Sequence, residues 1–222
     1  METSIIIETI VKVVVVLAVF SALAGFTTYI ERKVLAFMQR RLGPTNVGPY
    51  GLLQIAADGI KLFCKEDFIP ANANKPIFMV APLITAATAF IAMSAVPFFP
   101  EFEMFGYTVR PIISDINVGV LFVMSVGAVG LYGPLLGGMS SANKWALLGG
   151  ARTAIQLLSY EVVSGLSLLA PLMMVGSLSL IDINNYQSGG VSDWIIWSQP
   201  LAFILFTIAG FAETNRTPFD LL

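Results

Sequence analysis

One stretch decides the fold: residues 155–175 read IQLLSYEVVSGLSLLAPLMMV. It is as long as the ~20 apolar residues that a helix needs to cross the hydrocarbon core of a bilayer. Its only charged side chain is Glu161, which has no cationic residue within one helical turn. A bare carboxylate at bilayer depth costs about 2.5–3.5 kcal/mol on insertion scales. Such a residue indicates a function, and proton relay, ion passage and ligand capture are the natural ones.

The composition predicts an integral membrane protein. Hydrophobic residues make up 56% of the chain and charged residues 12%, whereas ordinary soluble domains are about 25% charged. The formal charge of −2 gives no indication of nucleic-acid binding. The single cysteine, Cys64, excludes an internal disulfide and a Cys-rich iron–sulfur site, and the lack of histidine excludes His-based haem, zinc and nucleophile chemistry. We therefore expect this chain itself to bind no metal and no redox cofactor.

Five apolar segments predict an all-α fold, a polytopic transmembrane helical bundle. They cover about residues 5–30, 77–99, 116–138, 146–175 and 194–212. The first segment follows an acidic leader with Glu2 and Glu8, whereas a signal peptide begins with basic residues, so we interpret it as a retained span. We interpret the glycines of the third segment as sites of close helix packing. Residues 1–222 are expected to form a single membrane domain.

Basic residues predict the orientation of the spans. They concentrate between the first two spans and recur near the loop between spans three and four and after span five. These residues are Arg32, Lys33, Arg40, Arg41, Lys61, Lys65, Lys75, Lys144, Arg152 and Arg216. The two opposite loops hold only Arg110. We therefore expect the N-terminus outside and the C-terminus inside.

The first inside loop, residues 31–76, is too long for a simple connection. Two turn signals, Gly43-Pro44 and Gly48-Pro49, interrupt it. After them, residues 50–63 carry apolar side chains at helical spacing. This pattern predicts a short amphipathic helix that lies along the membrane surface.

Several motifs, in one order, resemble a known family. The matching stretches are Glu31-Arg32-Lys33, Gln39-Arg40-Arg41-Leu42-Gly43-Pro44, Val47-Gly48-Pro49, Ala57-Asp58-Gly59-Ile60-Lys61-Leu62-Phe63, Asn143-Lys144-Trp145 through Arg152, Ser159-Tyr160-Glu161-Val162 and Ala212-Glu213-Thr214-Asn215-Arg216-Thr217-Pro218-Phe219-Asp220. Together they resemble the H-type membrane subunit (subunit 1) of proton-pumping NADH:quinone oxidoreductase, respiratory complex I. That family usually has about eight spans, so the resemblance predicts that this chain is a C-terminally truncated member.

The resemblance implies a subunit of a translocating oxidoreductase, with no independent catalytic activity. It implies that Glu161 and Glu213 carry the first part of a proton-transfer path. It places four residues near a quinone-binding chamber: Arg32, Asp58, Lys61 and Arg216. It gives supporting positions to four others: Glu31, Arg152, Tyr160 and Asp220.

The resemblance also implies the surroundings of the chain. Quinone would be the substrate, and FMN and iron–sulfur clusters would lie on partner subunits. The partners would be peripheral iron–sulfur subunits together with small and antiporter-like membrane subunits. The location would be the bacterial inner (plasma) membrane.

The surroundings of Glu161 can also be deduced from helix geometry. Ser164, Gly165 and Leu168 lie at i+3, i+4 and i+7, so this face of the helix is small and lets another helix approach closely. Arg152 lies roughly half a turn around and ~13 Å along the helix axis, too far to neutralise Glu161. Glu161 must therefore find water or a partner helix, or stay protonated. A neutral side chain that hydrogen-bonds between helices is the alternative interpretation.

Other interpretations stay open. Glu213 and Arg216 can form an ordinary interfacial salt bridge, and the basic residues of the first inside loop can serve topology alone, against anionic lipid. Tyr160 and Gln156 can support a chain of waters or simply pack. Three other functions are compatible: a homologous subunit of a ferredoxin-, deazaflavin- or hydrogenase-linked membrane complex, a standalone ion transporter, or a non-catalytic anchor.

Overall fold

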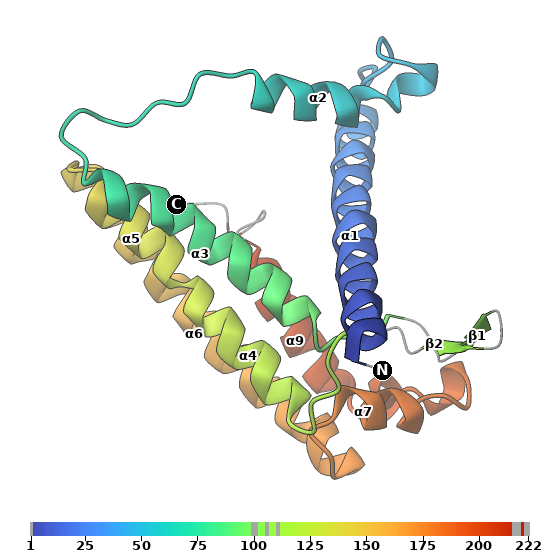
Figure 1. Ribbon diagram of the computed structural model, residues 1–222. Coiled ribbons are helices and arrows are strands. Elements are labelled where there is room, and N and C mark those ends of the chain that lie inside the picture. The colour runs from blue at the N-terminus through green and yellow to red at the C-terminus, as the bar shows by residue number, and fades with distance from the viewer. Residues whose placement is uncertain (1, 99–101, 105–106, 110–111, 215–218, 220–222) are drawn as a thin grey trace. The chain divides into compact units, whose positions relative to one another are not determined.

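The computed structural model describes residues 2–98, 102–104, 107–109, 112–214 and 219. It confirms the predicted all-α fold and adds one short hairpin, β1 with β2 (Figure 1). The elements in chain order are α1 (Glu2–Met38), η1 (Pro49–Gly51), α2 (Gln54–Phe63), α3 (Lys75–Met93), β1 (Phe102–Met104), β2 (Tyr107–Val109), α4 (Gly119–Gly130), α5 (Tyr132–Ser140), α6 (Lys144–Val175), α7 (Leu180–Tyr186), η2 (Val191–Asp193), α8 (Ile195–Ser198) and α9 (Pro200–Glu213). They form two compact units, residues 1–68 and residues 69–222. A single membrane domain over the whole chain stays a prediction.

In the first unit, α1 is longer than the sequence pattern suggested. The apolar run ends at Ile30, but the helix continues to Met38. Neither proline nor glycine occurs between Gly25 and Gly43, so nothing in this stretch breaks the helix. Glu31, Arg32 and Lys33 therefore belong to a helix, and the loop that was expected to begin at residue 31 begins after Met38.

The amphipathic helix expected at residues 50–63 is confirmed as a helix, α2, over Gln54–Phe63. It lies across the C-terminal part of α1 (Figure 1). The two helices approach closely at Gly25, where an added Cβ would lie 2.7 Å from Cγ2 of Ile55. One turn further along α1, the Tyr29 hydroxyl donates a hydrogen bond to the Tyr50 carbonyl at 2.8 Å. The absence of a side chain at Gly25 and the hydrogen bond from Tyr29 together hold α2, and the turn before it, against α1.

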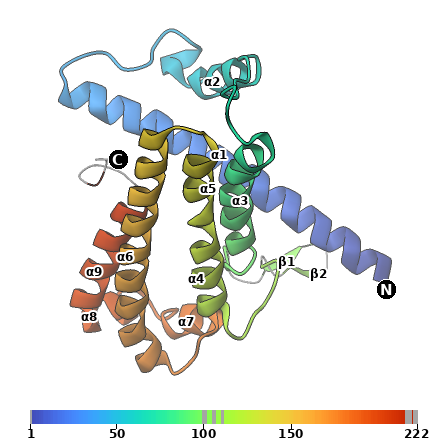
Figure 2. The same cartoon turned by 90° about the vertical axis from the view of Figure 1, so that its left-hand side faces the viewer.

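In the second unit, α3, α4 with α5, α6 and α9 lie side by side (Figures 1 and 2). Helix α3 packs on α4 and α5, α5 packs on α6, and α6 packs on α9. Glycines allow the closest approaches: a Cβ on Gly133 would collide with the Thr85 hydroxyl, and a Cβ on Gly138 would lie 3.1 Å from the Cα of Gly150. The interpretation of the span-three glycines as packing sites is confirmed at Gly133 and Gly138.

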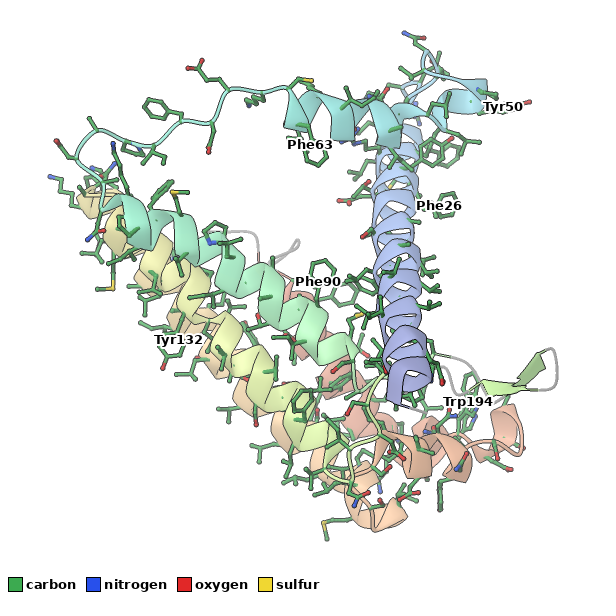
Figure 3. The ribbon with its side chains drawn as sticks, in the orientation of Figure 1. Phe26, Tyr50, Phe63, Phe90, Tyr132 and Trp194 are labelled. Carbon is green, nitrogen blue, oxygen red and sulfur yellow. The ribbon has the colours of Figure 1, made fainter. Side chains whose placement is uncertain are left out.

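The second unit buries small side chains and exposes large apolar ones, which is the reverse of the arrangement in a soluble domain. Most of its buried side chains are small, among them Ala81, Ala209, Ala212, Ser164 and Ser167. No large side chain is fully buried within the ranges that the structure describes. Large apolar side chains such as Phe90 and Tyr132 are exposed instead and project from their helices (Figure 3). Small residues inside and apolar residues outside are typical of helices that pack within lipid.

Four helical segments of the described residues are long and apolar enough to cross a membrane: 8–38, 75–93, 119–140 and 144–175. They correspond to the first four expected spans. The third is interrupted at Leu131, between α4 and α5. Pro134 explains the interruption, because it has no N–H to donate to the Gly130 carbonyl one turn earlier.

The fifth expected span, residues 194–212, is broken near its start. Gln199 leaves the helical conformation at φ −132° and ψ 57°, and Pro200 then begins α9. Backbone before a proline is pushed away from the helical region, which accounts for the break. The 14 residues of α9 extend ~21 Å, less than the ~30 Å of a hydrocarbon core. The expectation of one continuous span over 194–212 is therefore wrong.

The sequence did not predict the hairpin of β1 and β2 or the short helix α7, which lie between the long helices. The strands β1 and β2 pair antiparallel, with Phe102 opposite Val109. Helix α7 begins after Ser179, whose side chain accepts a hydrogen bond from the backbone N–H of Asp182. The backbone N–H of Val120, at the start of α4, donates to the Leu178 carbonyl at 3.1 Å. This bond ties the segment before α7 to α4.

Candidate functional site: a cavity between helices with two carboxylates

Glu161 and Glu213 line the same cavity of the second unit, which has a volume of about 340 Å³. Glu161 comes from the middle of α6 and Glu213 is the last residue of α9. Apart from these two, the lining is almost entirely apolar. It consists of Val96, Val120, Val123, Met124, Gly127, Ser164, Leu168, Pro171, Leu172, Leu180, Ile183, Phe206 and Gly210. The two predicted proton-transfer residues are thus brought together, although they are far apart in the sequence.

The wall from α6 follows the face deduced from the sequence. Ser164 and Leu168 line the cavity together with Glu161. The Ser164 hydroxyl donates to the backbone carbonyl of Glu161 at 2.9 Å, so its hydrogen is used for a bond within α6. Gly165 lies against α4, where an added Cβ would be 3.5 Å from Cε of Met124. Only the tip of a long side chain reaches this face, so the close approach of another helix to it stays a prediction.

The wall from α9 is formed by Phe206, Gly210 and Glu213, which lie at i, i+4 and i+7 on one face. Beside this face, Ala209 and Ala212 are 1% and 0% exposed. Their small side chains let α9 approach α6 closely. The packing of the two helices therefore depends on alanines, and it turns the Glu213 position toward the cavity.

Tyr160 and Gln156, one turn apart on α6, contact Phe219, a residue of the last quoted motif to which the sequence analysis gave no role. The Tyr160 ring meets the Phe219 ring edge-on at a centroid distance of 5.2 Å. The Gln156 amide donates to the Phe219 carbonyl at 3.3 Å. The ring contact favours the packing interpretation of Tyr160 over a role in a chain of waters. Both contacts place Phe219 against the helix that carries Glu161.

Arg152 does not join this site. Its side chain is exposed and does not line the cavity. The described residues contain two ion pairs, Lys12 with Glu8 and Arg32 with Asp58, and neither includes Arg152. Arg216 and Asp220 lie outside the described residues, so the pairing of Glu213 with Arg216 stays a prediction.

A second polar cluster joins α1 to α2 in the first unit. Nη1 of Arg32 lies 2.5 Å from Oδ2 of Asp58, and the Gln54 amide donates to Oδ1 of the same carboxylate at 3.0 Å. These two hydrogen bonds, that from Gln54 first, lower the pKa of Asp58 below its ordinary value of 3.8. Asp58 is therefore ionised at neutral pH and bound on both oxygens.

The other residues expected near the quinone chamber lie around this cluster. Lys61 is exposed on α2, three residues after Asp58, and its charge also lowers the pKa of Asp58. Glu31 is half-buried on α1 beside Arg32. The sequence analysis did not select Gln54, although its position at i−4 from Asp58 on a predicted helix was a usable signal.

Neither cluster resembles a metal centre. Within the described part of the chain, no group of three or more His, Cys, Asp or Glu side chains is placed to hold a metal ion. Two carboxylates at an apolar cavity can exchange protons with water. A carboxylate that is bound by a guanidinium and an amide can hold two helices together. The groups in these two clusters are thus suited to proton exchange and to electrostatic positioning.

The fold and the cavity define a class: a multi-pass helical membrane protein with ionisable groups between its helices. Comparison with known proteins gives the family. The model of the family described as NADH dehydrogenase matches residues 11–222. The chain belongs to the NADH dehydrogenase family, as the motifs predicted.

Similar proteins share one name, that of the H-type subunit of NADH-quinone oxidoreductase. The protein from Wolinella succinogenes is 78% identical over 220 residues, which are 99% of this chain and 67% of that protein. The protein from Nitratiruptor sp. is 74% identical over 100% of this chain and 67% of its own length. The protein from Helicobacter hepaticus is 70% identical over 98% of this chain and 65% of its own length. The chain thus spans about two thirds of these relatives.

Proposed function

We propose that this chain is the membrane subunit of an NADH-quinone oxidoreductase that links events at a quinone to proton movement between its own helices. The single observation that carries the proposal is the cavity that Glu161 and Glu213 share. Family membership supports it, because the relatives are named as subunits of that enzyme.

The proton path begins with Glu213 and continues to Glu161. A carboxylate in an apolar cavity is strongly affected by any change in nearby charge, because the surroundings screen it poorly. Protonation of one carboxylate lowers the electrostatic free energy of ionising the other. A change of charge near the C-terminal end of α9 is therefore passed through the cavity to the middle of α6.

The quinone chamber takes one wall from the first unit. The exposed Lys61 and the bound pair of Arg32 and Asp58 supply polar groups. Helix α2 also carries the exposed apolar residues Ile60 and Phe63, of which Phe63 is labelled in Figure 3. A quinone needs an apolar channel for its tail and a few polar groups at its head. Glu31, on the same helix as Arg32, serves as a supporting position of that wall.

The setting of this function is a multi-subunit complex in the bacterial inner membrane, with the N-terminus outside. FMN and iron–sulfur clusters on peripheral subunits deliver electrons to quinone, and small and antiporter-like membrane subunits continue the proton path. The names of the relatives favour this setting over a ferredoxin-, deazaflavin- or hydrogenase-linked complex.

The test uses the assembled complex in membrane vesicles. Glu161→Gln keeps the size and hydrogen-bonding capacity of the side chain but removes its titration. We expect proton pumping and coupled quinone reduction to fall about 100-fold, the lower end of typical general acid–base effects. Glu66→Gln, on an exposed loop residue of the first unit, is the matched control. Unchanged pumping in Glu161→Gln membranes with normal subunit content would remove Glu161 from the path.

A further inference from the structure

The cavity between the helices extends well beyond Glu161, toward the end of α6 at Val175. Leu172, which also lines it, lies ~17 Å beyond Glu161 along the helix axis. The lining residues of α6 all lie on one face of the helix. They are Glu161, Ser164, Leu168, Pro171 and Leu172. The proposed proton path uses only the part of the cavity that holds the two carboxylates, so the apolar part beyond them has a different role.

This far end of the cavity lies where several helices begin or end. Val96 follows the C-terminus of α3, Val120 is in the first turn of α4, and Leu172 is in the last turn of α6. The short helix α7 adds Leu180 and Ile183 to the lining. Figure 2 shows α7 beside the ends of α4 and α6. All these side chains are apolar.

Helix α7 has an apolar side and a polar side. Leu180 and Ile183, one turn apart, line the cavity. Asp182, Asn184 and Asn185 are exposed instead. A helix with this division of side chains lies at a boundary between water and an apolar region. The apolar side chains of α7 therefore lie between that boundary and the cavity.

Helix α7 is held at both ends. At its start, Leu180 lies against Gly119, where an added Cβ would be 3.4 Å from Cγ of Leu180. The backbone hydrogen bond from Val120 fixes the preceding segment to α4. At its end, the Gln187 side chain accepts a hydrogen bond from the backbone N–H of Ile195 at 3.2 Å. The helix is thus built as a fixed wall of the cavity.

The apolar end of the cavity has little to offer a water molecule, because a buried water needs polar partners. Hydrophobic constrictions stop conduction in channels by excluding water in this way. One acceptor lies further in. Pro171 has no N–H to donate to the Ser167 carbonyl one turn earlier, so that carbonyl can accept a hydrogen bond from water. Water that passed α7 would therefore find a partner on the way to Glu161.

We propose that Leu180 and Ile183 of α7 form a seal that keeps water at that surface from reaching Glu161. This rests on the proposed function, since only a Glu161 that carries protons needs to be protected from exchange on that side. Protons that reach Glu161 from Glu213 would otherwise pass to the water at α7. The seal thus separates a path that conserves energy from a leak.

A first experiment measures passive proton flow through the complete complex. Vesicles that contain the complex are given a potassium diffusion potential without any electron donor, and an enclosed pH-sensitive dye reports the flow. The variants are Leu180→Ala, Leu180→Ala with Glu161→Gln, and Ile181→Ala. Ile181→Ala is the matched control, because Ile181 is a half-buried residue of the same helix that does not line the cavity. Ile183→Ala opens the same wall if the Leu180→Ala complex does not assemble.

We expect Leu180→Ala to raise the rate of passive proton flow about 10-fold, equivalent to a barrier lower by ~1.4 kcal/mol. Addition of Glu161→Gln should return the rate to near that of the wild type, which Ile181→Ala should match. The seal is overturned if Leu180→Ala vesicles are as tight as the wild type, if Ile181→Ala leaks equally, or if Glu161→Gln does not reduce the leak. The proposed function falls separately, if Glu161→Gln with an intact seal pumps normally.

A second experiment detects water in the cavity without any proton flow. Val123, on the α4 wall of the cavity, is replaced by cysteine after Cys64→Ser has removed the only thiol of this chain. A small charged methanethiosulfonate reagent needs water to reach the new thiol and to react with its thiolate, and mass spectrometry of this chain measures the adduct. We expect labelling about 10-fold faster with Leu180→Ala, for the same lowering of the barrier, and no change with Ile181→Ala. Equal labelling rates in all three backgrounds overturn the seal.

Discussion

The Arg32 guanidinium and the Gln54 amide hold the two oxygens of the Asp58 carboxylate, at 2.5 Å and 3.0 Å respectively. Arg32 comes from α1 and the other two residues from α2, so the carboxylate joins the helices. Because both partners stabilise the ionised form, the pKa of Asp58 lies below 3.8. The contact between α1 and α2 at Asp58 therefore depends on pH.

The first prediction follows from the sign of that shift. A lowered pKa in the folded state stabilises the fold above the ordinary value of 3.8, and this contribution is lost as pH falls through the folded pKa. We expect the amide hydrogens of α2, after correction for intrinsic exchange rates, to lose protection from about pH 3.8 downward. Asp58→Asn should remove this pH dependence, because its amide does not titrate in that range. An identical pH profile in the Asn variant would contradict the role of Asp58.

The second prediction concerns close packing in the second unit. Gly133→Ala introduces a Cβ that collides with the Thr85 hydroxyl and lies 3.0 Å from the Ala81 carbonyl oxygen. Overpacking of this kind destabilises by about 1–3 kcal/mol. Gly149→Ala is the matched control, because a Cβ there meets nothing within 4 Å. We expect the temperature of unfolding in detergent to fall for Gly133→Ala only. Alanine is the better helix former, so an equal fall for both variants would show that the loss does not come from the contacts at Gly133.

The third prediction tests the packing interpretation of Tyr160. Its ring meets Phe219 edge-on, a geometry that contributes about 0.5–1.5 kcal/mol. Tyr160→Phe keeps the ring and removes the hydroxyl, so we expect both stability and coupled activity to stay close to those of the wild type. Tyr160→Leu removes the ring and should destabilise the contact. If Tyr160→Phe alone abolishes pumping, the hydroxyl belongs to the proton path and the packing interpretation is wrong.

The parts of the fold that the sequence predicted are those governed by helical periodicity. The face of Glu161, Ser164 and Leu168 could be deduced because 3.6 residues per turn fixes it without any partner. The cavity could not, since it depends on how α9 packs against α6. The break of the fifth span was visible in principle at Pro200, but the apolar composition of residues 194–212 hid it. A hydropathy average does not register the loss of a single hydrogen-bond donor.

The polar cluster of the first unit shows a different limit. Arg32 and Asp58 were selected through resemblance alone, because no local rule pairs residues on two separate helices. Their contact depends on the continuation of α1 past Ile30 and on the fit of Gly25 against Ile55. Both are packing effects, and a single sequence gives no distances between elements. Phe219 was missed for the same reason, since its contacts are with Gln156 and Tyr160 far away in the chain.

The fourth prediction tests whether the two carboxylates act in series. In the assembled complex, Glu161→Gln and Glu213→Gln should each reduce pumping, and the double variant should be about as impaired as the more severe single one. Residues that act as one unit are strongly non-additive, whereas independent effects would multiply. Multiplied losses in the double variant would place the two residues on separate paths in spite of their shared cavity.

The fifth prediction fills the cavity and leaves both carboxylates in place. Gly127 lines the cavity, and a Cβ built on it meets nothing within 4 Å, so the side chain of Gly127→Leu enters open space. An added isobutyl group excludes water from the route between Glu161 and Glu213. We expect pumping to fall by about 10-fold, equivalent to a barrier higher by ~1.4 kcal/mol, with normal amounts of assembled complex.

Gly149→Leu is the control for the cavity-filling variant, since Gly149 is equally open but does not line the cavity. It adds the same apolar group to a membrane helix and should pump like the wild type. Gly127→Leu membranes that pump at the wild-type rate would mean that protons do not pass through this cavity. The route would then have to reach Glu161 from another side of α6, and the shared cavity would be a consequence of packing alone.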